Sequence, residues 1–152
     1  MTVDVSANYL GLALKNPVIV ASGPLTFDVE GVKECADAGA GGVVLKSLFE
    51  EDIRDDTASL TASLHEQQGL HGEVYEYLRA HAGLRYGTRY YVDLIRQCKQ
   101  ETDIPIIASI NCLTSEWWQD FAREVEAAGA DALELNISVL PTNIEISGEE
   151  IE

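Results

Sequence analysis

The sequence has little positive charge, few cysteines and no long apolar run, and each shortage excludes a class of protein. Ten lysine and arginine residues stand against 26 aspartate and glutamate residues, which gives a formal net charge of −16. Such a surface repels phosphate backbones and anionic lipid, so we expect neither nucleic-acid nor membrane binding. No apolar run approaches the roughly 20 residues of a membrane-spanning helix. The first ten residues lack the basic start and apolar stretch of a secretory signal, which favours a cytoplasmic location.

The three cysteines are widely spaced and odd in number: Cys35, Cys98 and Cys112. They form no CxxC pair, so the sequence predicts reduced thiols rather than a disulfide framework. No histidine lies near Cys112 in the sequence, which favours a buried, inert thiol over a nucleophile. The three histidines are six and ten residues apart, spacings that match no common metal motif, so no metal site is expected.

What the chain does contain is 46% hydrophobic residues, arranged as short apolar runs followed by helical patterns. Four runs rich in apolar residues lie at residues 18–21, 42–45, 104–110 and 132–137. Continuous runs of this kind are typical of strands that are buried on both faces, as in a parallel sheet. Before them we expect a small antiparallel hairpin, formed by residues 3–5 and 10–14 with Ala7 and Asn8 between.

Helices are predicted between the apolar runs from their caps and their spacing. The predicted boundaries are Asp28 to Gly39, Thr88 onward, and Thr114 or Ser115 to Gly129. The second helix carries an apolar stripe formed by Tyr91, Leu94, Ile95 and Cys98. Residues 48–87 make an unusually long connection, and such connections in compact domains are usually functional or partly disordered.

Strand–helix alternation predicts right-handed crossovers and a parallel α/β sheet. Two architectures satisfy this pattern, namely an open doubly wound sheet and a closed (β/α)₈ TIM barrel. The turn after the first run, residues 22–25, is not a GxGxxG fingerprint, which argues against a dinucleotide-binding unit. Polar residues follow the apolar runs at their carboxyl ends: Ser22, Lys46, Ser47, Asn111 and Asn136. In a barrel these ends open onto one face, where active sites are built.

Three of the polar residues allow more than one interpretation. A cation at Lys46 would counter an anionic ligand or the charge on a reduced flavin, but the side chain could also extend into solvent. Asn136 could hold a planar heterocycle by paired hydrogen bonds, or it could close a turn. Glu134 alternates with leucines, so it could point to the barrel interior or pair with a neighbour, and we assign it a structural role first. Trp117 and Trp118 are interpreted as packing residues.

Four segments resemble the class 1 dihydroorotate dehydrogenases and the flavin domain of dihydropyrimidine dehydrogenases: NPVIVASGPLT (16–26), VVLKSL (43–48), IPIIASINC (104–112) and AAGADALELNIS (127–138). The match covers residues 9–48 and 103–138 well and residues 49–102 poorly. The resemblance implies a (β/α)₈ barrel that carries FMN at its carboxyl face. It also implies hydride transfer between the flavin and a dihydropyrimidine-like ring, a reaction of pyrimidine metabolism.

The resemblance further implies the residues that contact the flavin: Ala21, Ser22, Gly23, Lys46, Ser47, Ser109, Asn111 and Asn136. Lys46 and Asn136 would also lie near the substrate, and Lys46 would stabilise negative charge. The family's proton-accepting cysteine is matched here by Val139, which cannot move a proton, so the base is unassigned. The family's substrate-loop asparagines have no clear counterpart, and residues 67–70 are the nearest candidate.

A barrel of this kind needs about 250 residues, so we expect residues 1–152 to be the N-terminal half of a single FMN-binding domain. About four βα units would be present, and the flavin phosphate site would lie in the other half. Open sheet edges favour association, so a homo-oligomer or a completing chain is expected. Two alternatives remain: a non-catalytic half-barrel, and a flavin-free barrel lyase or isomerase that uses a strand-end lysine.

Overall fold

A computed structural model describes residues 3–50, 88–112, 115–137 and 147–148 of the chain. Its centre is one sheet in which every pairing is parallel, as the apolar runs predicted. The strands are β3 (Ile19–Val20), β4 (Gly42–Val44), β5 (Leu48–Phe49), β6 (Ile106–Asn111) and β7 (Ala132–Leu135). β3 pairs with β4, β4 and β5 both pair with β6, and β7 pairs with β6.

β4 and β5 lie along the same edge of β6 and act as one strand with a break. Val44 is opposite Ile107, whereas Leu48 is opposite Ile110, so four steps along this strand match three steps along β6. The break at residues 45–47 therefore contains one extra residue, which makes it a β-bulge. Counted this way, the sheet has four parallel strands in chain order, which is the order of consecutive strands in a (β/α)₈ barrel.

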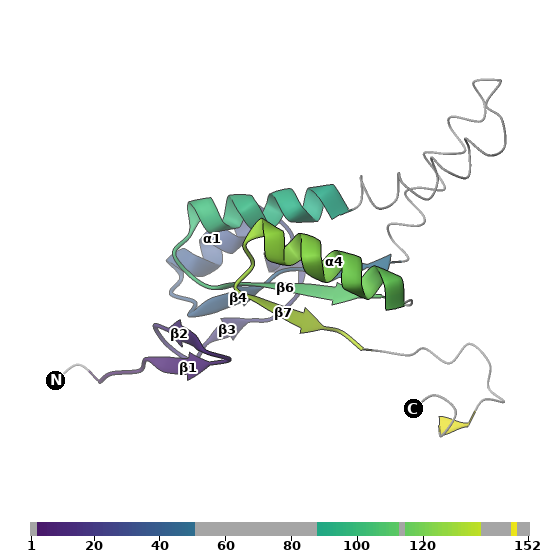
Figure 1. The fold of residues 1–152 in the computed structure, drawn as a ribbon. Coiled ribbons are helices and arrows are strands. Elements are labelled where there is room, and N and C mark those ends of the chain that lie inside the picture. The colour runs from purple at the N-terminus through teal and green to yellow at the C-terminus, as the bar shows by residue number, and fades with distance from the viewer. Residues whose placement is uncertain (1–2, 51–87, 113–114, 138–146, 149–152) are drawn as a thin grey trace, which may run out of the picture.

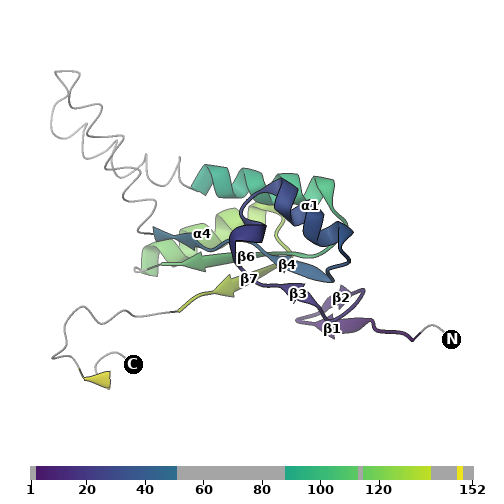
Figure 2. The same ribbon diagram turned by 180° about the vertical axis from the view of Figure 1, so that it is seen from behind.

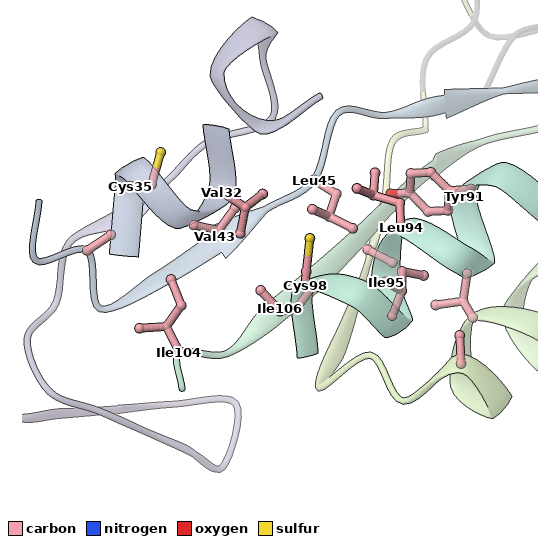
Figure 3. Packing of buried hydrophobic residues seen from close by; sticks show 14 residues of the cluster. Val32, Cys35, Val43, Leu45, Tyr91, Leu94, Ile95, Cys98, Ile104 and Ile106 are labelled. Carbon is pink, nitrogen blue, oxygen red and sulfur yellow. The ribbon is translucent and has the colours of Figure 1, made fainter. Parts of the chain in front are cut away.

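Three helices cover the same face of the sheet (Figures 1 and 2). They are α1 (Val29–Asp37), the helix that includes residues 88–101, and α4 (Ser115–Ala128), with the short 3₁₀ helix η1 (Pro24–Thr26) before α1. Their buried residues pack with one side of β4 and β6, as Figure 3 shows for Val32, Ile95 and Ile106. No described helix lies on the opposite face, which would be the interior of a closed barrel.

Most of the predicted helix features are confirmed. The Asp28 carboxylate accepts a hydrogen bond from the Gly31 amide at 2.9 Å, and Gly39 and Gly129 have φ values of 97° and 94° after their helices. The stripe of the second helix is buried as expected, over Tyr91, Leu94, Ile95 and Cys98. Thr88 and Ser115 are themselves helical, so neither is the residue outside the helix that the sequence predicted as a cap. Thr114 lies outside the described residues.

The predicted hairpin exists, but its expected bounds were wrong. It joins β1 (Ala7–Tyr9) to β2 (Leu12–Leu14), so Ala7 and Asn8 belong to a strand and residues 3–5 do not. The turn is Leu10-Gly11, with φ values of 53° and 81°. Two-residue hairpin turns of this kind need positive φ at both positions, which suits glycine but not leucine. Because Leu10 is an unusual turn residue, the dipeptide did not stand out in the sequence.

All three cysteines are buried and none forms a disulfide, as the sequence predicted. Burial raises the pKa of the Cys98 thiol to about 11, so this side chain stays protonated and unreactive near neutral pH. Within the described ranges, no helix combines the length and the apolar character that crossing a bilayer requires.

Candidate functional site

One polar side chain from each of the four strands meets on the side of the sheet that faces away from the helices. Ser22 follows β3, Ser47 lies in the break between β4 and β5, Ser109 lies in β6 and Glu134 lies in β7. The Ser22 and Ser47 hydroxyl oxygens are 3.0 Å apart, and those of Ser47 and Ser109 are 2.8 Å apart. Ser109 donates to a Glu134 carboxylate oxygen at 2.7 Å. We call these four residues the hydroxyl chain.

The alternation of side chains along β6 explains why the hydroxyl chain lies on this face. Ile106, Ala108 and Ile110 pack into the helix-side core. Because successive side chains of a strand point to opposite faces, Ser109 points to the interior. The same rule applies in β7, where Leu133 packs against the core and its neighbour Glu134 faces Ser109.

Because of the bulge, two consecutive residues, Lys46 and Ser47, both lie away from the helix side of the strand. Leu45 is in the core and Leu48 packs against it, although residues three apart in a regular strand would face opposite sides. The bulge is held by two backbone donors: the Lys46 amide bonds to the Thr26 carbonyl at 3.0 Å, and the Ser47 amide bonds to the Ser22 hydroxyl at 2.9 Å. The prediction that the strand ends before Lys46 is therefore corrected, because the strand resumes as β5.

Tyr91 fills the gap that the bulge leaves in the sheet. Its hydroxyl accepts a hydrogen bond from the Ser109 amide at 2.8 Å and donates to the Ser109 carbonyl at 3.1 Å. Both backbone groups of Ser109 face the edge of β6 at which residues 45–47 would pair if the strand were continuous. Burial, with a smaller contribution from the charge of Glu134, raises the pKa of Tyr91 far above its usual range. The hydroxyl thus stays neutral and keeps both a donor and an acceptor.

The other predicted site residues lie around the hydroxyl chain. Lys46 places its ammonium group over the Phe49 ring, 5.1 Å from the ring centroid. Asn111 is buried at the end of β6. Asn136 follows β7, and its backbone N–H group donates to the Ile110 carbonyl at 2.9 Å. Ala21 is exposed directly after β3.

Gly23 has an open surface above its backbone. A Cβ atom added there would meet no atom closer than the Ala21 carbonyl oxygen at 3.9 Å. Its φ of 179° is ordinary extended backbone, so conformation does not require glycine at this position. The free space is what a planar ligand would need to approach the main chain.

The described part of the chain also contains a cavity of about 530 Å³ between α1 and the helix that includes residues 88–101. It is lined by three carboxylates and four other residues: Asp28, Val29, Glu30, Tyr90, Asp93, Leu94 and Gln97. It contains none of the predicted site residues and lies in the helix layer, so we do not assign the site to it. The described residues include no cluster of metal-ligating side chains.

Two members of the site, Glu134 and Tyr91, were not predicted as functional residues. Glu134 had one sequence signal, namely a carboxylate inside an apolar strand run. Tyr91 had none, because an aromatic residue on an apolar helix stripe is typical of a core position. Val139, residues 67–70 and the three histidines lie outside the described residues.

Comparisons with known proteins confirm the predicted resemblance, although no family model matches the chain. It is 29% identical over 150 residues to the NAD-dependent dihydropyrimidine dehydrogenase subunit PreA of Escherichia coli, covering 91% of this chain and 33% of that protein. It is 32% identical over 133 residues to the catalytic subunit of dihydroorotate dehydrogenase B (NAD(+)) of Pyrococcus abyssi, covering 86% and 40%. The chain thus spans about a third to two fifths of the length of these curated relatives.

Among solved structures, the chain is similar to an IMP dehydrogenase/GMP reductase-like protein of Corynebacterium glutamicum. The TM-score is 0.51 at 15% identity, and the match covers 94% of this chain and 38% of that one. At this identity the similarity shows the fold alone. It confirms the predicted fold class, in which the chain forms part of a TIM barrel.

Proposed function

Because its curated relatives are dihydropyrimidine and dihydroorotate dehydrogenases, we propose that the chain is the N-terminal half of an FMN-dependent oxidoreductase domain. The reaction is hydride transfer between the flavin and a dihydropyrimidine-like ring, with a CH–CH group as the donor. The observation that supports this proposal best is the meeting of Ser22, Ser47 and Ser109 on the interior face of consecutive parallel strands.

The residues on this face fit a flavin ring. Ser22 and Ser47 are half-buried hydroxyls, and the open surface at Gly23 leaves room for a flat ring against the main chain. In the proposal, Ala21, Ser22, Gly23 and Ser47 hold one edge of the ring, and Asn111 and Asn136 approach it from the ends of β6 and β7. Ser109 is fully buried, so it acts on the ring through Ser47 and not by direct contact as the resemblance implied. The phosphate group is assigned to the part of the barrel that this chain does not include. When bound, FMN supplies the centre that accepts or donates the hydride.

Lys46 supplies positive charge in a chain with a net charge of −16. An ammonium group at the strand break offsets the negative charge that develops on a reduced ring system. The acidic groups of the chain would otherwise disfavour this negative charge. The Phe49 ring restrains the ammonium group through a cation–π contact. Asn136 orients the flavin and the pyrimidine. The proton acceptor is unassigned, since valine at position 139 has no group that can take a proton.

A whole barrel requires more strands than the described residues provide, so we propose that the chain associates with a second copy or with a completing chain. The two edges of the described sheet are β3 and β7. Leu135 and Ile137, at the end of β7, are 52% and 78% exposed. Apolar side chains at an open sheet edge favour pairing with further strands. We propose a cytoplasmic location for the assembled protein.

Visible absorbance tests the proposal directly. The full-length gene product, purified with added FMN, should show a flavin spectrum that a dihydropyrimidine or a dihydroorotate-like substrate bleaches. Lys46→Ala should slow this reduction by at least about a hundredfold, the usual effect of losing one preorganised charge-stabilising group. Lys15→Ala, which removes an exposed lysine outside the site, serves as the control.

Two outcomes would overturn the proposal. A protein that stays colourless after incubation with FMN would instead be the non-catalytic half-barrel. Trapping of Lys46 by borohydride in the presence of a carbonyl substrate would indicate the flavin-free lyase or isomerase. If Lys46→Ala is reduced as fast as the wild type, the role assigned to this residue is wrong.

A further inference from the structure

The hydroxyl chain has a direction, which follows from counting hydrogens. A serine hydroxyl carries one hydrogen. Ser109 gives its hydrogen to the Glu134 carboxylate at 2.7 Å, so the 2.8 Å contact must be Ser47 donating to Ser109. The hydrogen of Ser47 is then used, so the 3.0 Å contact must be Ser22 donating to Ser47. All three hydroxyls therefore point toward Glu134.

The same count shows which hydrogen-bonding positions of the hydroxyl chain remain available to a ligand. Each serine oxygen accepts two hydrogen bonds. Ser22 uses one acceptor position for the Ser47 amide at 2.9 Å, and Ser47 uses one for the Ser22 hydroxyl. Ser109 is fully buried. Within the described residues, a ligand at the two half-buried serines thus meets acceptor positions and no hydroxyl hydrogen.

We propose that Glu134 is a positioning residue that fixes this direction and thereby selects the ligand. The ligand class is a planar heterocycle with a ring N–H group directed at Ser22, because only Ser22 would lose its free acceptor position if the direction were reversed. A ring that presents an oxygen or an unprotonated nitrogen there would place two acceptors against each other and leave both unsatisfied. This inference rests on the proposed function for the location of the ring, and it adds which edge of the ring the site recognises.

A donor-only side chain at position 134 separates direction from structure. Glu134→Lys can still bond to Ser109, but its ammonium group donates and cannot accept. Ser109 must then donate to Ser47 and Ser47 to Ser22, so both acceptor positions of Ser22 are filled and its own hydrogen faces the ligand. A side chain that only ties β7 to β6 would tolerate this change without any effect on ligand choice.

The experiment compares ligands with and without the N–H group. Dissociation constants are measured for FMN against N3-methyl-FMN by flavin fluorescence, and for dihydrouracil against N,N′-dimethyldihydrouracil by calorimetry, with the full-length protein. In the wild type, the N–H form of one pair should bind at least about tenfold more tightly, as expected for one unmade buried hydrogen bond. The pair that shows the ratio identifies whether cofactor or substrate faces the serines.

In Glu134→Lys the ratio should shrink to within about threefold, because Ser22 no longer has a free acceptor position for the ring N–H group. A steric penalty of the methyl group would persist in this variant, so only the hydrogen-bond contribution is lost. Glu134→Arg, a second donor-only change, should shrink the ratio in the same way if Glu134→Lys does not fold. Glu126→Lys, the same change at an exposed position on α4, should leave the ratio intact.

Each remaining result would overturn the inference in an identifiable way. If the wild type binds a ligand pair and the ratio survives in Glu134→Lys and Glu134→Arg, Glu134 is only structural, and the proposed function stands. If the wild type binds both members of each pair equally, no ring N–H group faces Ser22, and the inference fails while the proposed function stands. If the wild type binds neither FMN nor dihydrouracil, the proposed function fails and takes the inference with it.

Discussion

The two faces of the same four strands are stabilised by different interactions. On the helix side, Val43, Leu45 and Ile106 are fully buried in apolar contacts. On the interior side, the same strands are joined through hydroxyl and carboxylate groups. Apolar packing is non-directional and tolerates small shifts, whereas hydrogen bonds need defined donors and acceptors. We therefore expect changes on the helix side to affect stability and changes on the interior side to affect ligand binding.

Tyr91 is the residue at which the two faces meet. Its ring belongs to the helix-side core, and its hydroxyl bonds to the backbone of Ser109, whose own side chain lies in the interior. Without this hydroxyl, the break that turns Lys46 and Ser47 away from the helices would leave two buried backbone groups unsatisfied. The Tyr91 phenol group thus links the site to the helix layer.

The largest effect is expected on the helix side, from Ile106→Ala. Removing this fully buried side chain should lower the free energy of unfolding by about 2–5 kcal/mol, through lost burial and a residual cavity. Urea denaturation measures this change. Ser109→Ala, on the other face of the same strand, should cost about 1 kcal/mol per lost hydrogen bond. Equal losses at both positions would contradict the contrast between the faces.

Tyr91→Phe should lower the free energy of unfolding by about 1–3 kcal/mol for a buried backbone group left unsatisfied. It should also weaken FMN binding, because the bulge that presents Ser47 loses its support. Tyr90→Phe is the matched control, since the Tyr90 hydroxyl is exposed and makes only a 3.4 Å contact to the Phe27 carbonyl. A stable Tyr91→Phe protein with unchanged flavin affinity would show that the bulge holds its shape without the phenol.

Two glycines, Gly41 and Gly23, differ in the space around them. A Cβ atom at Gly41 would collide with the Asn16 carbonyl oxygen, so Gly41→Ala should cost about 1–3 kcal/mol of stability. Gly23→Ala meets open space and should change stability by less than about 0.5 kcal/mol. Only the second change should weaken FMN binding, which fluorescence titration measures. The idea of an open flavin surface at Gly23 would not survive a variant with full affinity.

The smallest effect concerns alkaline pH. Burial raises the pKa of Cys98 from 9.0 to about 11, so the folded state holds this proton where the unfolded state releases it. The resulting stability is complete below pH 9 and is lost as the pH rises toward about 11. Tyr91 acts in the same direction above pH 10. Cys98→Ala should therefore flatten the decline in melting temperature between pH 9 and 11, and an unchanged slope would assign the decline to other groups.

Much of the architecture could be predicted because its signals are local. The four strand runs and the Asp28 and Gly39 boundaries lie where the apolar spacing and the caps placed them. The hairpin was misplaced because its turn uses Leu10, whose positive φ no propensity indicates. Ser22 and Ser47 were predicted from their places at the ends of apolar runs, whereas Ser109 was implied only by the family resemblance. Their contact with one another appeared only in three dimensions.

Local patterns in the sequence are enough to specify the helices and strands, because periodicity, capping and burial preference act over a few neighbouring residues. The register of the strands, in contrast, depends on the fold as a whole. The extra residue at Lys46 and Ser47, the contact of Glu134 with Ser109 and the insertion of the Tyr91 hydroxyl all depend on how β4, β5, β6 and β7 align. That alignment is set by hydrogen bonds between segments about 20 to 60 residues apart, which no local pattern specifies.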